Sequence, residues 1–498
     1  MQIELEALNR QVLEKITPTP EEYRVVETLS RHLEQQILKA CQQQNINATV
    51  RVEGSIAKDT WLKENPDIDI FIRLPTTIAR EKLGEIGLTI ARDAVAQETA
   101  KVIERYAEHP YLEIIIMGQR VDIVPCYNTK PGKWQSATDR TPYHTDYIKQ
   151  HLTPKMRGEV RLLKRFMQGI GVYGAEIKIG GFSGYLCELL ILTYGSFIQT
   201  IQAFATYSKR VIIDIEHHFL GKEKEITTLF LEPLIIVDPV DKDRNVASAV
   251  QTDKLYKFIG ATRAFLQNPL EAFFFVPKQL PLTAETLEHK MDKCNSTVLF
   301  VVTEGIQTVP DVLWGQLYKT KRSLRKLLEL NDYKVLRDTV WSNESTLNVF
   351  VFELEQQVIA NIKKHTGPPL ERLDECNSFL SKYTKNEQTV AGPYIEEGKW
   401  VVEITRKNTN AVTLLREKLA KDGGKTMGVP ELLAKTFKEN VSVLVNKEIA
   451  KIYNKKEENT ETFRVFFTDF LSGKPFWLTL NQNEKRNLVS KQCDFDTT

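Results

Sequence analysis

Cysteine is scarce in this 498-residue chain, and its placement excludes two kinds of protein. A disulfide framework and a cysteine zinc site both need cysteines at close, regular spacing, and no CxxC pair is present here. The pattern favours a reducing compartment, so we expect a cytoplasmic protein. The six cysteines are scattered along the sequence: Cys41, Cys126, Cys187, Cys294, Cys376 and Cys493.

The sequence also lacks a strong excess of charge of either sign. Its formal net charge is +2, so any nucleic-acid surface should be a local basic patch. The first residues, MQIELEALNR, are charged from the start, which is not the pattern of a signal peptide. No internal repeat is evident, and the length predicts several domains.

One long run without charge needs a separate explanation. Leu189 to Ser208 carries no charged residue over 20 positions, which is long enough to cross a bilayer. It also contains two glutamines, three threonines, two serines and a glycine, which disfavour insertion. We therefore predict a buried helix and no association with a membrane.

The most informative stretch is Gly54 to Phe71, GSIAKDTWLKENPDIDIF. Side chains alternate along a strand, so Asp67 and Asp69 should point the same way, about 7 Å apart. Burying two such carboxylates without a counter-charge is costly, and a divalent metal such as Mg²⁺ would remove that cost. The alternative is an exposed edge strand whose aspartates face solvent.

The start of the same stretch predicts a phosphate contact. Ile56 to Leu62 can form a short helix that begins at Gly54 and Ser55. Free N–H groups at such a start are a preferred seat for phosphate, and the Ser55 hydroxyl adds a donor. An ordinary helix cap is the alternative.

A later hairpin supplies a third carboxylate. Leu112 to Ile116 and Val121 to Pro125 read as its strands, with Asp122 on the face opposite Val121 and Ile123. Alone, Asp122 would be a solvent-facing polar residue. Beside Asp67 and Asp69, it would complete a site for two metal ions roughly 4 Å apart, which could activate a 3′-hydroxyl and neutralise a triphosphate.

Two basic segments have a functional and a structural interpretation. Lys164 lies on a predicted amphipathic helix, Glu159 to Gln168, where a solvated basic face is the alternative. Further on, a strand–helix–strand–strand pattern predicts a ferredoxin-like, RNA-recognition-like domain. The basic side chains of its helix either contact RNA phosphates or simply face solvent. The pattern spans 297–303, 312–330, 333–341 and 345–354, and the helix carries Lys319, Lys321, Arg322, Arg325 and Lys326.

Local pattern assigns three further segments. Ile78 to Ala107 reads as a long helical region, and Asp238 to Val246 as a turn-rich loop. His365 to Pro369, HTGPP, reads as a break in the chain.

These residues resemble a known family. Gly-Ser, a DxD strand and a third aspartate in a later strand are typical of the nucleotidyltransferase superfamily related to polymerase beta. Longer blocks are similar to archaeal-type (class I) CCA-adding enzymes, which are tRNA nucleotidyltransferases. The resemblance runs from about residue 19 to 405 and is densest from Gly54 to Ala247. The blocks are GSIAKDTWLKENPDIDIF, VDIVPCY, DRTPYH, EVRLLKRFMQGIGVYGAE, GFSGYLCELLILTYGSF, DPVDKDRNVA and HTGPP.

The resemblance implies a multidomain α+β fold and an activity. We expect a polymerase-beta-like head at 1–140, a helical neck at 141–267, a ferredoxin-like body at 268–365, and a C-terminal tail with the remainder of the body at 366–498. The implied reaction is template-independent addition of C, C and A to the 3′ end of tRNA from CTP and ATP. It proceeds by two-metal in-line transfer and releases pyrophosphate.

The resemblance also implies a role for each site residue. Asp67, Asp69 and Asp122 would hold Mg²⁺ ions, while Gly54, Ser55 and Lys58 would contact phosphates. His144, Lys164 and Tyr173 would line the ATP and CTP pocket, and Arg244 would act near the base and primer end. Lys58 departs from the arginine usual there, which keeps the charge but loses bidentate contact. The implied partner is the acceptor stem and TΨC arm of tRNA, with a homodimer possible.

Two other interpretations remain. A poly(A) polymerase or oligoadenylate synthase shares the three carboxylates but not the DRTPYH and DPVDKDRNVA blocks. An inactive RNA-binding scaffold with the same fold should have lost the metal site, whereas all three carboxylates are present.

Overall fold

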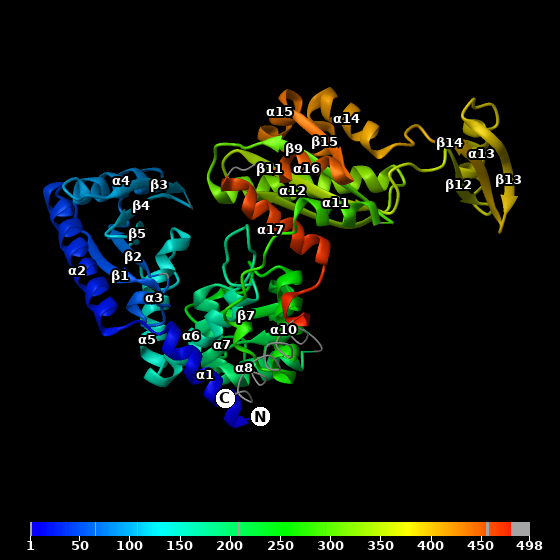
Figure 1. Cartoon of the computed structure of the whole chain (residues 1–498). Coiled ribbons are helices and arrows are strands. Elements are labelled where there is room, and N and C mark those ends of the chain that lie inside the picture. The colour runs from blue at the N-terminus through cyan, green and yellow to red at the C-terminus, as the bar shows by residue number, and fades with distance from the viewer. Residues whose placement is uncertain are drawn as a thin grey trace, which may run out of the picture. The chain divides into compact units, whose positions relative to one another are not determined.

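A five-stranded sheet, the head, forms where the N-terminal sequence alternates apolar and polar residues. In β2, Ile68, Ile70 and Ile72 are buried, while Asp67 and Asp69 lie on the other face. The order is β1-β2-β5-β4-β3, with β2 and β5 parallel and the other neighbours antiparallel. Helices α2 and α4 bury their apolar faces on the isoleucine side (Figure 1). The elements are α2 (Pro20–Gln43), β1 (Thr49–Glu53), α3 (Gly54–Ala57), β2 (Asp67–Leu74), α4 (Arg80–Val95), β3 (Lys101–Tyr106), β4 (Pro110–Ile116) and β5 (Gln119–Tyr127). Helix α1 (Gln2–Ile16) precedes them and packs into the core of the neck through Val12 and Ile16.

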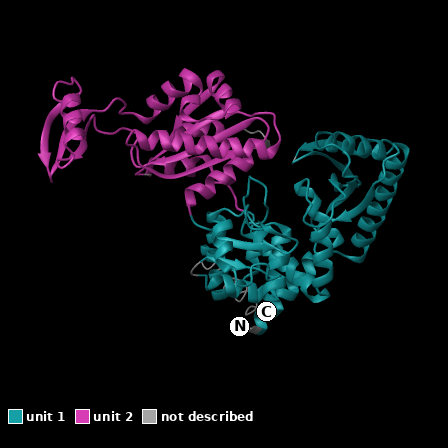
Figure 2. Ribbon diagram, turned by 180° about the vertical axis from the view of Figure 1, so that it is seen from behind, with its two compact units in different colours: residues 1–278, 474–498 teal, residues 279–473 magenta. Residues whose placement is uncertain are grey.

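The head belongs to the first of two units in this computed structural model. Unit 1 comprises residues 1–278 and 474–498, and unit 2 comprises residues 279–473 (Figure 2). The structure describes residues 2–64, 66–106, 108–207, 210–293, 295–454 and 458–479.

Helices dominate the rest of unit 1, the neck. Its core gathers five phenylalanine rings around Phe166. Trp477 of η5 (Phe476–Leu478) joins this core, stacked on Phe273 with ring centroids 6.4 Å apart. The elements are η1 (Ala137–Arg140), α5 (Thr141–His151), α6 (Pro154–Gly169), α7 (Gly184–Tyr194), α8 (Phe197–Ala205), β6 (Val211–Ile213), α9 (Glu223–Leu229), β7 (Leu234–Asp238), β8 (Asp241–Asn245), α10 (Thr252–Gln267) and η2 (Glu271–Phe273).

The body, in unit 2, contains the predicted strand–helix–strand–strand run as β9, α12, β10 and β11. A strand from much later in the chain, β15, pairs with β9 and completes the order β10-β11-β9-β15. Helices α12, α14 and α15 cover one sheet face, and α11, α16 and α17 the other. The elements are α11 (Ala284–Lys293), β9 (Thr297–Glu304), α12 (Pro310–Leu330), β10 (Val335–Ser342), β11 (Leu347–Leu354), α14 (Ala411–Asp422), η3 (Lys425–Met427), α15 (Glu431–Glu439), β15 (Val441–Val445), η4 (Asn446–Ile449), α16 (Ala450–Tyr453) and α17 (Glu458–Ser472).

Between β11 and α14 the chain builds a separate small sheet, the tail. Its order is β12-β14-β13, and α13 packs on one face through Phe379 and Tyr383. The elements are β12 (Ile362–Pro369), α13 (Leu373–Tyr383), β13 (Thr389–Glu396) and β14 (Lys399–Thr405).

The prediction of a single helix for the long uncharged run is wrong. Helix α7 ends at Tyr194, and Gly195 takes a φ of +87°, which continues no helix. Ser196 then caps α8 by accepting a hydrogen bond from the Gln199 N–H. Ser208 lies outside the described residues. Within the described ranges, no helix is both long and apolar enough to cross a membrane.

Four other segments differ from the secondary structure that their local sequence predicts. The helix predicted from Ile78 ends at Val95, and Lys101–Tyr106 is instead edge strand β3; Ala107 is not described. The helix predicted for 56–62 is only the four-residue α3, Gly54–Ala57. The loop predicted at 238–246 is a hairpin of β7 and β8, and HTGPP is the end of strand β12.

Candidate active site

The polar face of the head sheet carries a row of carboxylates. Parallel pairing of β2 with β5 puts Asp69 directly opposite Asp122. Antiparallel pairing of β5 with β4 then puts Glu113 opposite Asp122. Residues opposite each other in a sheet share a face, so these side chains gather on the side away from the isoleucine core.

Sequence reasoning missed the arginine that stands among these carboxylates. Arg120 Nη2 donates to Asp122 Oδ2 at 3.0 Å, and its Nε lies 3.0 Å from Glu113 Oε2. Its Nη1 lies 4.0 Å from Asp67 Oδ1. Arg120 is two residues before Asp122 on β5, and this spacing, which puts both on one strand face, was the available signal.

Burial and like charge raise the pKa values of Asp69 and Asp122. Loss of solvation, with repulsion from Asp122 and Asp67, raises the pKa of Asp69 to about 7. Loss of solvation, only partly offset by Arg120, raises the pKa of Asp122 to about 6. The ionised forms are therefore held at a free-energy cost that an added cation would reduce.

The donor set fits a divalent cation. Asp122 Oδ1 is buried and, within the described part of the chain, lacks a hydrogen-bond partner. Carboxylate oxygens are the hard ligands that Mg²⁺ prefers. Among the described residues, no three His, Cys, Asp or Glu side chains are already gathered into a metal-ligating group.

Gly54 is required where the chain turns from β1 into α3. Its φ is +66°, in the region that glycine adopts most easily. A Cβ at this position would lie 1.9 Å from Asp69 Oδ2, so only glycine leaves room for that carboxylate. Gly54 is thus more than the start of a helix, because its backbone lies against Asp69.

Both predicted pocket lysines meet one buried glutamate that sequence reasoning missed. Lys58 Nζ donates to Glu188 Oε2 at 2.6 Å, and Lys164 Nζ lies 3.5 Å from Glu188 Oε1. The side chains of Lys58, Lys164 and Glu188 are 7%, 2% and 0% exposed. The alternative of a solvated basic face for Lys164 is therefore wrong. Glu188 is the one charged residue in the sequence of α7, and this was the available signal.

The ionisation of this cluster follows from its charges. Burial alone would raise the pKa of Glu188, but Lys58 and Lys164 outweigh it and hold that pKa below its usual value. Burial lowers the pKa of Lys164, and Glu188 opposes this. Thr60 completes the cluster, because its hydroxyl donates to Glu188 at 2.6 Å and accepts from Lys164 at 3.0 Å.

A second buried carboxylate, Asp238, binds both His144 and Arg244, two of the residues predicted to contact the nucleotide. His144 Nε2 lies 2.9 Å and Arg244 Nη1 2.7 Å from Asp238 Oδ2. The Tyr185 ring stacks on His144 with centroids 4.1 Å apart. Arg140 binds Asp241 at 2.6 Å, so the DRTPYH and DPVDKDRNVA blocks meet at two points. Sequence reasoning quoted both blocks but missed Asp238 and Tyr185.

The two clusters adjoin each other. Lys58 Nζ lies 5.7 Å from the centre of the Tyr185 ring, which joins the lysine pair to the His144 side. A Cβ on Gly184 would lie 3.1 Å from the Tyr173 hydroxyl and 3.4 Å from Lys164 Nζ, so Tyr173 reaches the same place. The structure therefore brings the predicted pocket residues together.

Comparison with known proteins gives the family. Residues 34–144 match a nucleotidyltransferase domain, residues 158–275 the second domain of tRNA nucleotidyltransferase, and residues 295–443 the C-terminal domain of CCA-adding enzyme. A CCA-adding enzyme of Methanosarcina barkeri is 40% identical over 83% of this chain and 89% of its own length. Those of Methanosarcina mazei and Methanopyrus kandleri are 37% and 32% identical over 93% and 95% of this chain, and 97% and 98% of theirs. The chain belongs to the CCA-adding enzyme family.

Membership confirms the predicted family, the nucleotidyltransferase class and the multidomain α+β fold. Nucleotidyltransferases of this fold generally use a divalent metal ion.

The basic helix α12 divides into two sets of side chains. Lys321 and Arg325 both pair with Asp338 on β10, so they stabilise the body. Lys319, Arg322 and Lys326 are exposed, and their spacing of three and four residues puts them on one helix face. Two of the five predicted RNA-binding residues, Lys321 and Arg325, therefore form ion pairs within the body.

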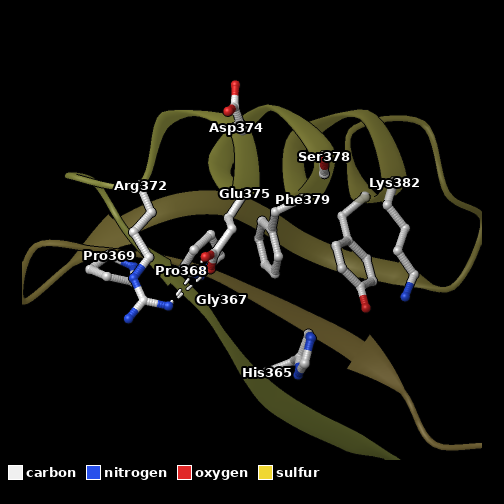
Figure 3. Close-up of a pocket in the computed structure, with 11 residues that line it drawn as sticks. His365, Gly367, Pro368, Pro369, Arg372, Asp374, Glu375, Ser378, Phe379 and Lys382 are labelled. Atoms are coloured by element: carbon white, nitrogen blue, oxygen red, sulfur yellow. Dashed lines mark hydrogen bonds and ion pairs between the residues drawn. The ribbon is translucent and has the colours of Figure 1, made fainter.

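The tail contains a cavity of about 660 Å³ between β12 and α13. His365 and Phe379 stack along it with centroids 5.8 Å apart, and Lys382 Nζ lies 5.0 Å from the Tyr383 ring centre. Figure 3 shows Arg372 and Glu375 meeting at one end and Lys382 at the other. Reading HTGPP as a break missed this site.

Proposed function

We propose that this chain adds C, C and A in turn to the 3′ end of tRNA, from CTP and ATP, without a nucleic-acid template. The observation that carries the proposal is the register that sets Asp69 opposite Asp122 and against Gly54. Carboxylates in this arrangement, in a chain of the CCA-adding enzyme family, suit transfer of a nucleotidyl group with release of pyrophosphate.

The carboxylates would hold Mg²⁺ through Asp67, Asp69 and Asp122. When bound, the ion supplies positive charge for the triphosphate and lowers the pKa of the attacking 3′-hydroxyl. The chain itself fixes the geometry. The β2–β5 pairing orients two of the carboxylates, Gly54 leaves space for Asp69, and Arg120 partly neutralises Asp122 and Asp67.

The adjoining clusters would bind the nucleotide. Ser55 and Lys58 would contact its phosphates, beside Lys164 and Tyr173. Two ammonium groups against the one carboxylate of Glu188 leave a buried positive charge, which a phosphate would balance. His144 and Arg244, both held by Asp238, would lie toward the base.

The remaining domains would hold the tRNA. We propose a catalytic head (1–140), a nucleotide- and primer-binding neck (141–267) and an RNA-binding body and tail that extend from 268 to 473, because Trp477 returns to the core of the neck. The acceptor stem and TΨC arm are the proposed contacts, because duplex RNA is recognised mostly by shape and phosphates. The aromatic rings and Lys382 of the tail cavity suit stacking and phosphate contact. A homodimer also stays a proposal.

A single-nucleotide incorporation assay tests the activity. With a tRNA that lacks its CCA end, we expect two additions with CTP alone and one more when ATP is supplied, after which addition stops. Mass spectrometry of the RNA reads the number and identity of added nucleotides. Addition of adenosines only, with CTP ignored, would identify a poly(A) polymerase and contradict the proposal.

The exposed face of α12 gives a separate prediction for RNA binding. Changing Arg322 and Lys326 to glutamine should weaken tRNA binding and reduce the slope of log affinity against log salt, by about 0.7–0.9 for each phosphate that the variant no longer neutralises. Filter binding between low and moderate salt measures the slope. Lys321→Gln is the control on the same helix: it removes a partner of Asp338 and should lower the melting temperature while keeping the slope. Equal slopes for all proteins would contradict this role for α12.

A further inference from the structure

Arg120 pairs with the same carboxylates that the proposed metal site requires. Its Nη2 donates to Asp122 Oδ2 at 3.0 Å, and its Nη1 lies 4.0 Å from Asp67 Oδ1. A guanidinium group carries a fixed positive charge, because it does not lose its proton in proteins. The chain itself therefore supplies part of the positive charge that a divalent ion would bring to Asp67 and Asp122.

Neighbouring side chains on the sheet hold Arg120 in this place. Glu113 Oε2 lies 3.0 Å from Arg120 Nε, so one guanidinium group contacts three carboxylates. Arg105 in turn donates to both oxygens of Glu113, at 2.9 and 3.1 Å. Glu113 is only 4% exposed, and a buried carboxylate with charge-assisted hydrogen bonds fixes the Nε end of Arg120. Arg105, Glu113 and Arg120 thus form a chain of ion pairs across β3, β4 and β5 that ends at the proposed metal ligands.

A divalent ion and Arg120 compete for these carboxylates. Mg²⁺ binds its oxygen ligands at about 2.0–2.1 Å, which would put two positive charges side by side at Asp122. A nearby cation lowers the proton affinity of a carboxylate by about 10- to 1,000-fold, and it weakens the binding of a metal ion for the same reason. Asp122 Oδ1 is buried and has no hydrogen-bond partner in the described part of the chain, so one oxygen stays available to metal. Arg120 therefore weakens metal binding without blocking it.

We propose that Arg120 is a positioning residue that makes the carboxylates favour a metal ion already bound to a nucleoside triphosphate over a free metal ion. The phosphates of CTP and ATP carry several negative charges, which offset the guanidinium charge that a free ion would meet alone. Metal and nucleotide therefore strengthen each other's binding, since such coupling is reciprocal. The inference rests on the proposed function, because it takes Asp67, Asp69 and Asp122 as the metal ligands.

The test is Arg120→Gln, which removes the charge and keeps a polar side chain. We expect the nucleotide-free variant to bind Mn²⁺ at least about tenfold more tightly than the wild type, measured from the electron paramagnetic resonance signal of the free ion. An exchange-inert chromium(III) complex of CTP, measured by equilibrium dialysis, should gain much less affinity, because its phosphates already offset Arg120. The difference between these two gains decides the inference.

Three further variants show whether the effect comes from charge at this site. Arg120→Lys retains the charge, so its Mn²⁺ affinity should stay close to that of the wild type. Arg92→Gln breaks an exposed ion pair with Glu104 in the same domain and should leave the Mn²⁺ affinity unchanged. Adding Asp69→Asn to Arg120→Gln should abolish the tight Mn²⁺ binding, which assigns that binding to the proposed metal site.

A purely structural role for Arg120 gives the opposite result, because a loosened site binds Mn²⁺ more weakly. Unchanged or weaker Mn²⁺ binding by Arg120→Gln, or equal gains for Mn²⁺ and the chromium(III) complex, would overturn the inference. Addition of C and A by the wild type would still support the proposed function in either case. Arg120 is 46% exposed, so its loss should be tolerated, and Arg120→Met is the second variant that removes the charge if Arg120→Gln does not fold.

Discussion

Replacing Asp69 with asparagine should lower nucleotide incorporation at least about 1,000-fold, because it removes a carboxylate from the proposed metal site. The same change should not destabilise the metal-free protein. Asp69 lies opposite Asp122, and loss of solvation and repulsion raise its pKa to about 7. Removing its charge relieves that cost, so the melting temperature in EDTA should match or exceed that of the wild type. Incorporation assays and calorimetry measure the two effects.

Metal dependence separates this effect from a general loss of structure. Mg²⁺ should raise the melting temperature of the wild type by mass action, and should do so much less for Asp69→Asn. Gly54→Ala should also lose incorporation, because its Cβ would lie 1.9 Å from Asp69 Oδ2. Asp93→Asn, an exposed carboxylate of the same domain, should keep full activity. If Asp69→Asn kept more than about a tenth of wild-type activity, the metal assignment would be wrong.

The catalytic strands could be predicted because their signals are local. The alternation of apolar and polar residues around Asp67, Asp69 and Asp122 predicts that these carboxylates lie on the faces opposite the buried apolar residues. The structure confirms this prediction. Alternation does not predict the register between paired strands. That Asp122 lies opposite Asp69, with Arg120 opposite Asp67, depends on pairing between strands distant in sequence.

The buried counter-charges were missed for the same reason. Lys58 and Glu188 are separated by 130 residues, so neither local pattern contains the other. Lys164 looked like part of a solvated face because its own helix is amphipathic, yet Thr60 and Glu188 cover it. A helix periodicity describes one element and not the chain that packs against it.

Strand errors arose where pairing overrides local preference. Lys101–Tyr106 continues a region rich in helix-forming residues, but it pairs with β4 as an edge strand. Gly367, Pro368 and Pro369 are turn formers, yet they end β12, which is an edge of the tail sheet. Proline is tolerated at an edge because no neighbouring strand needs its missing N–H.

Glu188→Gln is expected to have the largest effect on stability. It removes the one carboxylate that pairs with both Lys58 and Lys164, whose side chains are 7% and 2% exposed. Removing one partner of a buried ion pair typically costs about 3–5 kcal/mol of the free energy of unfolding. Denaturant unfolding of the variant and the wild type measures this loss.

The pH dependence of that loss identifies its cause. Burial already lowers the pKa of Lys164, and loss of Glu188 lowers it further. Between this lowered pKa and the ordinary value of the unfolded chain, the unfolded state binds more protons, so stability rises with pH. The deficit of Glu188→Gln should therefore shrink as the pH is raised from neutral toward the ordinary pKa of lysine.

A double variant and an exposed ion pair test whether Glu188 is the counter-charge of the two buried lysines. Lys164→Met combined with Glu188→Gln removes one of the two stranded charges, so it should recover part of the lost stability. Glu64→Gln breaks the pair with Arg165, where Glu64 is 50% exposed, and should cost less than about 1 kcal/mol. If Glu188→Gln cost no more than Glu64→Gln, or if Lys164→Met restored nothing, Glu188 would not be the counter-charge that allows two lysines to be buried beside the proposed nucleotide site.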